Sequence, residues 1–203
     1  MKIFCVGRNY SEHAKELGNA VPDEPVIFMK PKTALLQPHT PFYYPEFTND
    51  LHYECELVLR ISKNGKYIQE KHASKYYDAI TVGIDFTARD VQNQLKEKGL
   101  PWEKAKAWDN SAVIGKWQPL TAVSDKNNIS FALNKNSEQV QEGNSSQMIF
   151  GFDYIVSHIS QFFSINIGDL VFTGTPKGVG EAVVGDELEG FLDGQSLFAL
   201  EVK

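Results

Sequence analysis

Six prolines fall between positions 22 and 45 of this 203-residue chain, and they restrict its fold more than any other feature. They are Pro22, Pro25, Pro31, Pro38, Pro41 and Pro45. Proline lacks a backbone N–H, and its ring clashes with the preceding turn inside a helix. The segment 22–50 therefore predicts extended pieces and turns, and a long helix is excluded from it.

The rest of the chain is typical of short strands with few helices. Strands are predicted at 3–6, 54–61, 80–86, 111–115, 129–133, 170–173, 188–192 and 197–202, and 129–141 reads as a hairpin. Helices are predicted at about 10–17, from Thr87 to about Lys98, and at 154–163, where apolar residues recur at helical spacing. Because βαβ alternation is missing, we expect a mixed, β-rich α+β domain spanning 1–203.

Composition narrows the class of protein. The net charge of -6 argues against a nucleic-acid partner, which asks for a basic face. Cys5 and Cys55 can form one disulfide at most, so we expect free thiols in a reducing compartment. No run approaches the roughly 18 apolar residues of a membrane span, and the apolar opening is too short for a signal peptide. We therefore expect a cytoplasmic protein with no membrane partner.

The local pattern that most strongly indicates a functional site is Glu54-Cys55-Glu56. In a strand the side chains of Glu54 and Glu56 point to one face, where like charges repel unless a cation lies between them. Mg²⁺ favours such oxygen ligands. Asp85, at the end of an apolar strand, can complete the set. The alternatives remain open: two solvated glutamates on an edge strand, and Asp85 as the cap of the helix that follows.

A second candidate pair lies on the first predicted helix. His13 and Glu16 are three residues apart and share a face. Glu16 can orient His13 and raise its basicity, which gives a general base near neutral pH. An ordinary surface pair is the alternative.

Arg89, Gln92 and Lys106 are candidate substrate contacts. Arg89 and Gln92 are three apart on one predicted helix, and arginine can bind both oxygens of a carboxylate. Lys106 has a less polar sequence setting than Lys96 or Lys98. For each of these candidates, a solvated polar group on the surface is the alternative. The loop 173–180 fails the phosphate-loop spacing, and what remains is a tight loop that can present backbone N–H groups and the Thr175 hydroxyl. His158 is interpreted as core packing.

Taken together, these segments resemble the fumarylacetoacetate hydrolase family, in particular its acylpyruvase and oxaloacetate decarboxylase-like branch. The matching stretches are 5–10 with His13 and Glu16, 28–31, 52–57, 85–92, 98–102 with Lys106, and 173–180. They cover nearly the whole chain in the family's order.

The resemblance implies a rolled mixed β-sheet fold, a homodimer, and a lid helix with an extended segment in residues 1–50. It implies metal ligands at Glu54, Glu56 and Asp85, binding Mg²⁺ with Mn²⁺ as the alternative. It implies catalytic roles for His13, Glu16 and Lys106. The substrate-binding positions that it implies are Lys30, Arg89, Gln92 and Thr175. The segment 107–110 departs from the family pattern, which leaves substrate choice open.

The implied activity is metal-dependent cleavage of a carbon–carbon bond in a small 2-oxo acid, through a pyruvate enolate. Acylpyruvate hydrolysis needs a water activated by His13, whereas oxaloacetate decarboxylation does not. The alternatives are a 2-hydroxyhepta-2,4-dienedioate isomerase, an oxaloacetate tautomerase, and a catalytically silent ligand-binding homologue.

Overall fold

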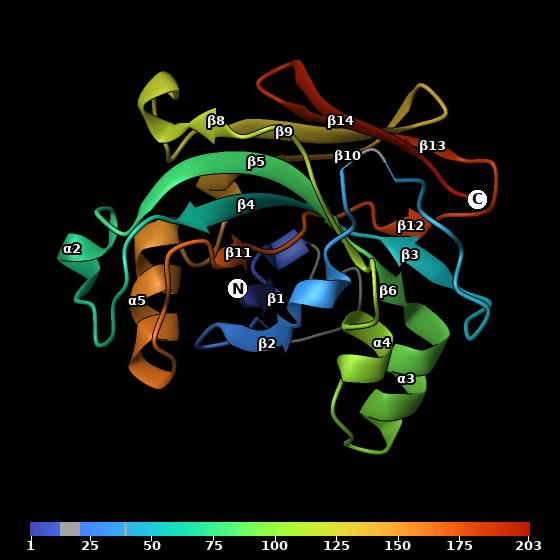
Figure 1. Ribbon diagram of the computed structural model, residues 1–203, viewed down its shortest axis with the longest axis horizontal. Helices are drawn as coiled ribbons and strands as arrows, with labels where there is room; N and C mark the ends of the chain where they lie inside the picture. The colour runs from blue at the N-terminus through green and yellow to red at the C-terminus, as the bar shows by residue number, and fades with distance from the viewer. Residues whose placement is uncertain (13–20, 39) are drawn as a thin grey trace.

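The structure is a computed structural model that describes residues 1–12, 21–38 and 40–203. The predicted catalytic pair, His13 and Glu16, and most of the helix predicted at 10–17 lie outside the described residues. A strongly curved mixed sheet of seven strands forms the frame of the molecule (Figure 1). The β-rich fold predicted from the sequence is therefore confirmed.

The main sheet has the order β2-β1-β11-β4-β5-β7, with β8 also paired to β5. Its strands are β1 (Ile3–Gly7), β2 (Val26–Lys30), β4 (Cys55–Ile61), β5 (Tyr77–Asp85), β7 (Ala112–Ile114), β8 (Gln118–Pro119) and β11 (Leu170–Phe172). Strands β1 and β11 pair in parallel, whereas the other pairs are antiparallel. A strand from late in the chain thus lies between two early ones.

Two smaller sheets complete the β structure. The first contains β9 (Ser130–Lys135), β10 (Glu138–Asn144), β13 (Glu187–Leu192) and β14 (Gln195–Glu201) in the order β10-β9-β13-β14, and it lies over β5 and β4 (Figure 1). The second contains β12 (Gly180–Glu181), β3 (Leu51–Tyr53) and β6 (Thr87–Ala88), with β3 in the middle. The predicted hairpin at 129–141 is present as β9 and β10, and the strands predicted at 188–192 and 197–202 pair with each other as β13 and β14.

The helices lie at the ends of the main sheet. Helices α3 (Arg89–Glu97) and α4 (Glu103–Lys106) lie together beyond β6, and α2 (Glu70–Ala73) packs on α5 (Phe152–Phe162) at the other end (Figure 1). Short 3₁₀ turns occur at η1 (Lys32–Ala34), η2 (Leu120–Ala122) and η3 (Ser145–Gln147). Of the described helices, none is long and apolar enough to cross a membrane.

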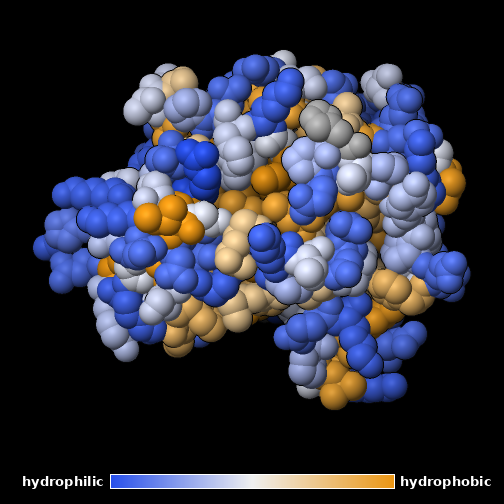
Figure 2. Space-filling view, in the orientation of Figure 1, coloured by the Kyte–Doolittle hydropathy of each residue, from blue (hydrophilic) through white to orange (hydrophobic). Residues whose placement is uncertain are grey.

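The main sheet is covered on both faces, which explains its continuous apolar runs. A large cluster that includes Leu57, Leu59 and Val82 fills one side, and a small cluster around Val58 and Phe172 fills the other. The face drawn in Figure 2 is mostly hydrophilic, with apolar side chains showing in its central hollow. The apolar surface is thus used mainly for internal packing.

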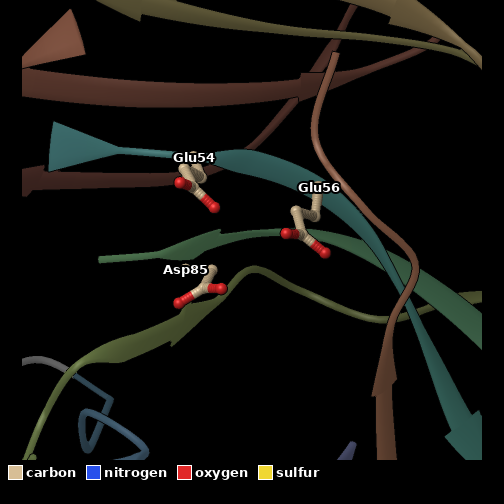
Figure 3. Close-up of side chains that lie close together, drawn as sticks. All are labelled: Glu54, Glu56 and Asp85. Carbon is tan, nitrogen blue, oxygen red and sulfur yellow. The ribbon is translucent and has the colours of Figure 1, made fainter. Parts of the chain in front are cut away.

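Two local predictions are wrong in ways that matter for the site. The helix that the sequence predicts from Thr87, with Thr87 as its cap, begins instead at Arg89, with Ala88 at the N-cap position and no side-chain cap. Glu54 does not belong to the strand of Glu56, because the chain changes sheets at Glu54, between β3 and β4. Asp85 is not a cap either, and its side chain turns toward the two glutamates (Figure 3).

Candidate active site

Three buried carboxylates meet at the end of the main sheet. One oxygen each from Glu54, Glu56 and Asp85 lies within 4.8 Å of the others, and Figure 3 shows the three groups pointing toward a common space. The exposed fractions are only 6%, 2% and 1%. The edge-strand alternative, with two solvated glutamates, is therefore wrong.

Strand pairing explains this convergence. Glu56 lies opposite Gly83 in the antiparallel β4–β5 ladder, and the backbone N–H of Asp85 donates to the carbonyl of Glu54 at 2.8 Å. On its other side, β5 pairs with β7, and a Cβ at Gly83 would lie 2.4 Å from the carbonyl oxygen of Val113 there, so only glycine allows β7 to approach β5 this closely. The ladder therefore fixes all three carboxylates by backbone contacts.

Three buried cations surround two of the carboxylates. Lys106 Nζ donates to Glu54 Oε2 at 2.7 Å, to Asp85 Oδ2 at 2.8 Å and to the Thr87 hydroxyl at 2.6 Å. Arg89 donates to Glu54 Oε1 at 2.6 Å, and Lys30 Nζ lies 2.7 Å from Asp85 Oδ1. Burial lowers the pKa of Lys106, but Asp85 and Glu54 outweigh this effect and leave the pKa raised, so Lys106 is a cation.

Glu56 has a different environment. Its Oε2 accepts the backbone N–H of Gly174 at 2.7 Å, and none of the three cations bonds to it in the described part of the chain. Burial, then Asp85 and then Glu54, raises its pKa well above the usual value. A cation among the carboxylates would relieve this repulsion.

The donor set fits a hard divalent ion. The converging groups are carboxylate oxygens, the ligands that Mg²⁺ and Mn²⁺ prefer, with no histidine or thiolate among them. Each carboxylate has about four lone-pair sites, so Glu54 and Asp85 can bind a metal while they accept from lysine and arginine. The chemistry of the described residues therefore fits a magnesium or manganese site.

A small pocket opens onto the carboxylates. The described residues enclose about 40 Å³. Besides the three carboxylates, Arg89 and Lys106, the lining includes Arg8, Phe28, Gln92, Lys96, Trp102 and Thr175. Burial, with Arg89 next, lowers the pKa of Lys96. The ring centroids of Phe28 and Trp102 lie 6.0 Å apart. Cationic groups and aromatic rings together suit a small organic anion.

The structure separates Lys30 from the other predicted substrate contacts. Arg89, Gln92, Lys106 and Thr175 line the pocket, whereas Lys30 does not. Lys30 is 1% exposed and lies behind Asp85, where it also donates to the Ser111 carbonyl at 2.9 Å and to the Ser111 hydroxyl at 3.0 Å. Arg89 also donates to Gln92 Oε1 at 2.6 Å. Lys30 thus contacts the wall of the site from the protein interior.

The loop after β11 closes another side of the site. Gly174 has φ +104°, and a Cβ there would lie 2.7 Å from the Cβ of Asn9, so a side chain is excluded on both grounds. The Asn9 amide donates to the carbonyls of Thr173 at 2.8 Å and Phe150 at 3.0 Å. This loop is not a phosphate loop, and it directs one backbone N–H at Glu56.

Sequence reasoning missed Thr87 and Gln141. The Thr87 hydroxyl accepts from Lys106, which required the position of α4 to be known. Gln141 is 2% exposed and bonds to the segment between the two glutamates. Its strand looked like a polar hairpin arm, so no local signal distinguished it. His158 is buried and stacks on Tyr154, as predicted for core packing.

Comparison with known proteins identifies related sequences and related folds. The sequence matches the family described as fumarylacetoacetate (FAA) hydrolase C-terminal over residues 2–202. It is 42% identical over 197 residues to oxaloacetate tautomerase YcgM of Escherichia coli, covering 97% of this chain and 90% of that protein. It is 40% identical over 189 residues to the mitochondrial oxaloacetate decarboxylase of Dictyostelium discoideum, covering 93% and 87%.

Among solved structures, the fold matches fumarylpyruvate hydrolase from Pseudomonas aeruginosa, crystallised in complex with Mn²⁺ and pyruvate. The TM-score is 0.93 and the sequence identity is 38%, and the match covers 100% of this chain and 89% of that one. That enzyme binds a divalent metal and a small 2-oxo acid, which is the combination that the donor set and the cationic pocket suit here.

Proposed function

Because the chain belongs to the fumarylacetoacetate hydrolase family, we propose that it is a divalent-metal enzyme that cleaves a carbon–carbon bond in a small 2-oxo acid. The substrate is an acylpyruvate, which is hydrolysed, or oxaloacetate, which is decarboxylated. The observation that carries this proposal is the buried carboxylate triad of Glu54, Glu56 and Asp85, surrounded by Lys30, Arg89 and Lys106.

We assign Mg²⁺ as the resident ion, with Mn²⁺ as the alternative, held by the three carboxylates. When bound, such an ion supplies Lewis-acid stabilisation of the negative charge that develops on the 2-oxo group as the bond breaks. Two observations support a divalent cation here: the three ligands are carboxylate oxygens, and burial with repulsion from Asp85 and Glu54 raises the pKa of Glu56.

Charge balance supports an anionic substrate. The three carboxylates and the three buried cations cancel, so a divalent ion leaves an excess of two positive charges at the site. Arg8 and Lys96 line the same pocket. A dianion such as oxaloacetate suits this excess. Lys106, at the boundary between the triad and the pocket, is placed to neutralise charge on the reacting acid.

For acylpyruvates, we propose that His13, oriented by Glu16, takes a proton from the attacking water. Neither residue lies in the described part of the chain, so this assignment rests on the resemblance. His13→Ala should reduce acetylpyruvate hydrolysis more than oxaloacetate decarboxylation, because decarboxylation needs no water. Equal losses for the two substrates would refute the water-activating role.

The metal assignment is tested with Glu56→Gln. We expect it to raise the Kd for Mn²⁺ by at least about 10-fold and to abolish turnover of acetylpyruvate and oxaloacetate, because a ligand is lost. Glu138→Gln, at an exposed glutamate of β10, is the matched control. Unchanged Mn²⁺ affinity in Glu56→Gln would refute the assignment.

A second candidate function is oxaloacetate tautomerisation, favoured by the name of the Escherichia coli relative. It uses the same enolate but only moves a proton. Following the enol and keto forms together with CO₂ release separates the two activities: tautomerisation without CO₂ or acylpyruvate cleavage would refute bond cleavage. Mn²⁺ binding without any turnover would indicate a silent ligand-binding homologue.

We also propose a homodimer, on the strength of the family resemblance. Light scattering coupled to size exclusion tests it directly. A mass of about 46 kDa, twice the chain mass of 22.8 kDa, is the expected result, and a monomer mass would refute it.

A further inference from the structure

Gln141 connects the second sheet to the segment that carries two of the proposed metal ligands. It lies on β10, outside the main sheet, and it is 2% exposed. The backbone N–H of Cys55 donates to Gln141 Oε1 at 2.9 Å. Cys55 is the single residue between Glu54 and Glu56, so this bond holds the peptide that sets the spacing of the two glutamates.

The same amide reaches the loop after β11. Gln141 Nε2 donates to the Thr175 hydroxyl at 3.0 Å and to the Pro176 carbonyl at 3.2 Å. The Thr175 hydroxyl in turn donates to the carbonyl of Cys55 at 2.8 Å. Gln141, Thr175 and Cys55 therefore form a closed ring of hydrogen bonds, called the Cys55 ring below, in which both polar groups of the Cys55 backbone are bound.

A β-bulge in β10 turns the side chain of Gln141 toward this ring. The register of β10 against β9 shifts between Gln139 and Gln141, which places a bulge at Val140. Gln139 is exposed and Gln141 is buried, although strict alternation would put both on one face. Bulges redirect side chains in this way and are frequent next to active sites. Gly178, with φ +92°, lies against this bulge, where a Cβ would meet the Val140 carbonyl at 2.5 Å.

We infer that Gln141 is a positioning residue for the metal site, acting through the Cys55 ring on Glu54 and Glu56. Gln141 is not among the described residues that line the pocket, and its hydrogen bonds go to Cys55, Thr175 and Pro176. The inference rests on the proposed function, in that the site must bind a divalent metal. A second role follows for Thr175: its proton is held by Cys55, so its hydroxyl can accept from a ligand but not donate to one.

Gln141→Met is the principal test, because methionine keeps the length of the side chain and removes both amide groups. We expect the Kd for Mn²⁺, measured by calorimetry on the full chain well below its melting temperature, to rise about 10-fold or more. At saturating Mn²⁺ we expect kcat to fall by a larger factor than KM rises, because the carboxylates are displaced whereas Gln141 does not itself line the pocket. Gln139→Met, on the exposed face of the same strand, should match the wild type in all three quantities.

Thr175→Val opens the Cys55 ring at its other side chain with little change of shape. It should also raise the Kd for Mn²⁺. The double variant with Gln141→Met should lose less Mn²⁺-binding free energy than the sum of the losses in the two single variants, because both substitutions break the same ring. Should Gln141→Met fail to fold, Thr175→Val decides the question. A Kd within two-fold of the wild type in the folded variant would overturn the inference.

The Mn²⁺ readout separates this inference from the proposed function. Wild-type protein that binds Mn²⁺ but turns over no 2-oxo acid refutes only the proposed function, since the effect of Gln141→Met on Kd is still measured. Wild-type protein that binds no Mn²⁺ refutes both.

Discussion

Lys30 gives the sharpest test of how the carboxylate site is held together. Its ammonium group lies 2.7 Å from Asp85 Oδ1 and donates to both the carbonyl and the hydroxyl of Ser111, and to the carbonyl of Lys106. Lys30→Met keeps the apolar stem of the side chain and removes the charge. Asp85 would then lose one of its two buried cations, and the Ser111 and Lys106 carbonyls would lose a shared donor.

The expected loss follows from the burial of the pair. Removing one partner of a buried ion pair costs about 3–5 kcal/mol, because the other charge stays buried without compensation. For a domain of this size each kcal/mol lowers Tm by about 2–4 °C, so the expected fall is about 6–20 °C. The assay is urea and thermal unfolding of the metal-free protein. Saturating Mn²⁺ should recover part of the loss, because an ion bound by Asp85 supplies positive charge and stabilises only the folded state.

Lys32→Met is the matched control, since Lys32 is exposed two residues along the chain. Lys32→Met should change the free energy of unfolding by no more than about 0.5 kcal/mol. If Lys30→Met costs less than about 1 kcal/mol, Lys30 is not the counter-ion that keeps Asp85 charged in the interior, and the charge balance proposed for the site is wrong.

Three further predictions concern separate parts of the molecule. Gly174→Ala should raise the Kd for Mn²⁺ and lower Tm, because the new Cβ meets Asn9; Gly185→Ala, with φ +96° and open space around it, should lower Tm slightly without affecting the Kd. Arg89→Lys should raise KM for oxaloacetate several-fold, since a lysine cannot hold Glu54 and Gln92 together as the guanidinium does; a KM unchanged within two-fold would refute this. Asp186→Asn should lower the free energy of unfolding by about 2 kcal/mol at pH 7. Bonds from Val183, Asn136 and Lys135 outweigh desolvation and lower the pKa of Asp186, so the difference in stability from the wild type should shrink as the pH falls below the unfolded value of 3.8. A difference that does not change with pH would refute this prediction.

Local pattern was sufficient for much of the fold. The apolar runs around Leu57 and Val82 predicted buried strands, and the spacing of Ile155, Val156 and Ile159 predicted the α5 helix. Both predictions depend only on residues that are close together in the sequence. The convergence of Glu54, Glu56 and Asp85 was also within reach, since Glu56 and Asp85 lie near one end of two adjacent strands.

What the sequence did not reveal depends on pairing between distant segments. Glu54 looks like part of the strand of Glu56, and only the partners of β3, which are β6 and β12, show that the chain changes sheets there. Gln141 is one of several polar residues in its hairpin, and its importance comes from a bulge and from a loop 34 residues further on. Tertiary contacts of this kind leave no periodic trace.

The position of β11 between β1 and β4 has a consequence for how the chain folds. Among the described strands, β1 and β2 form one antiparallel pair and β4 and β5 another, and β11 is the strand that joins the two pairs. Leu170 pairs with Ile3 on one side and with Arg60 on the other. Such long-range closure makes folding slow compared with a helical domain. The N–H that Glu56 accepts belongs to Gly174, in the loop that follows β11, so the proposed metal site is assembled only when this long-range closure has taken place.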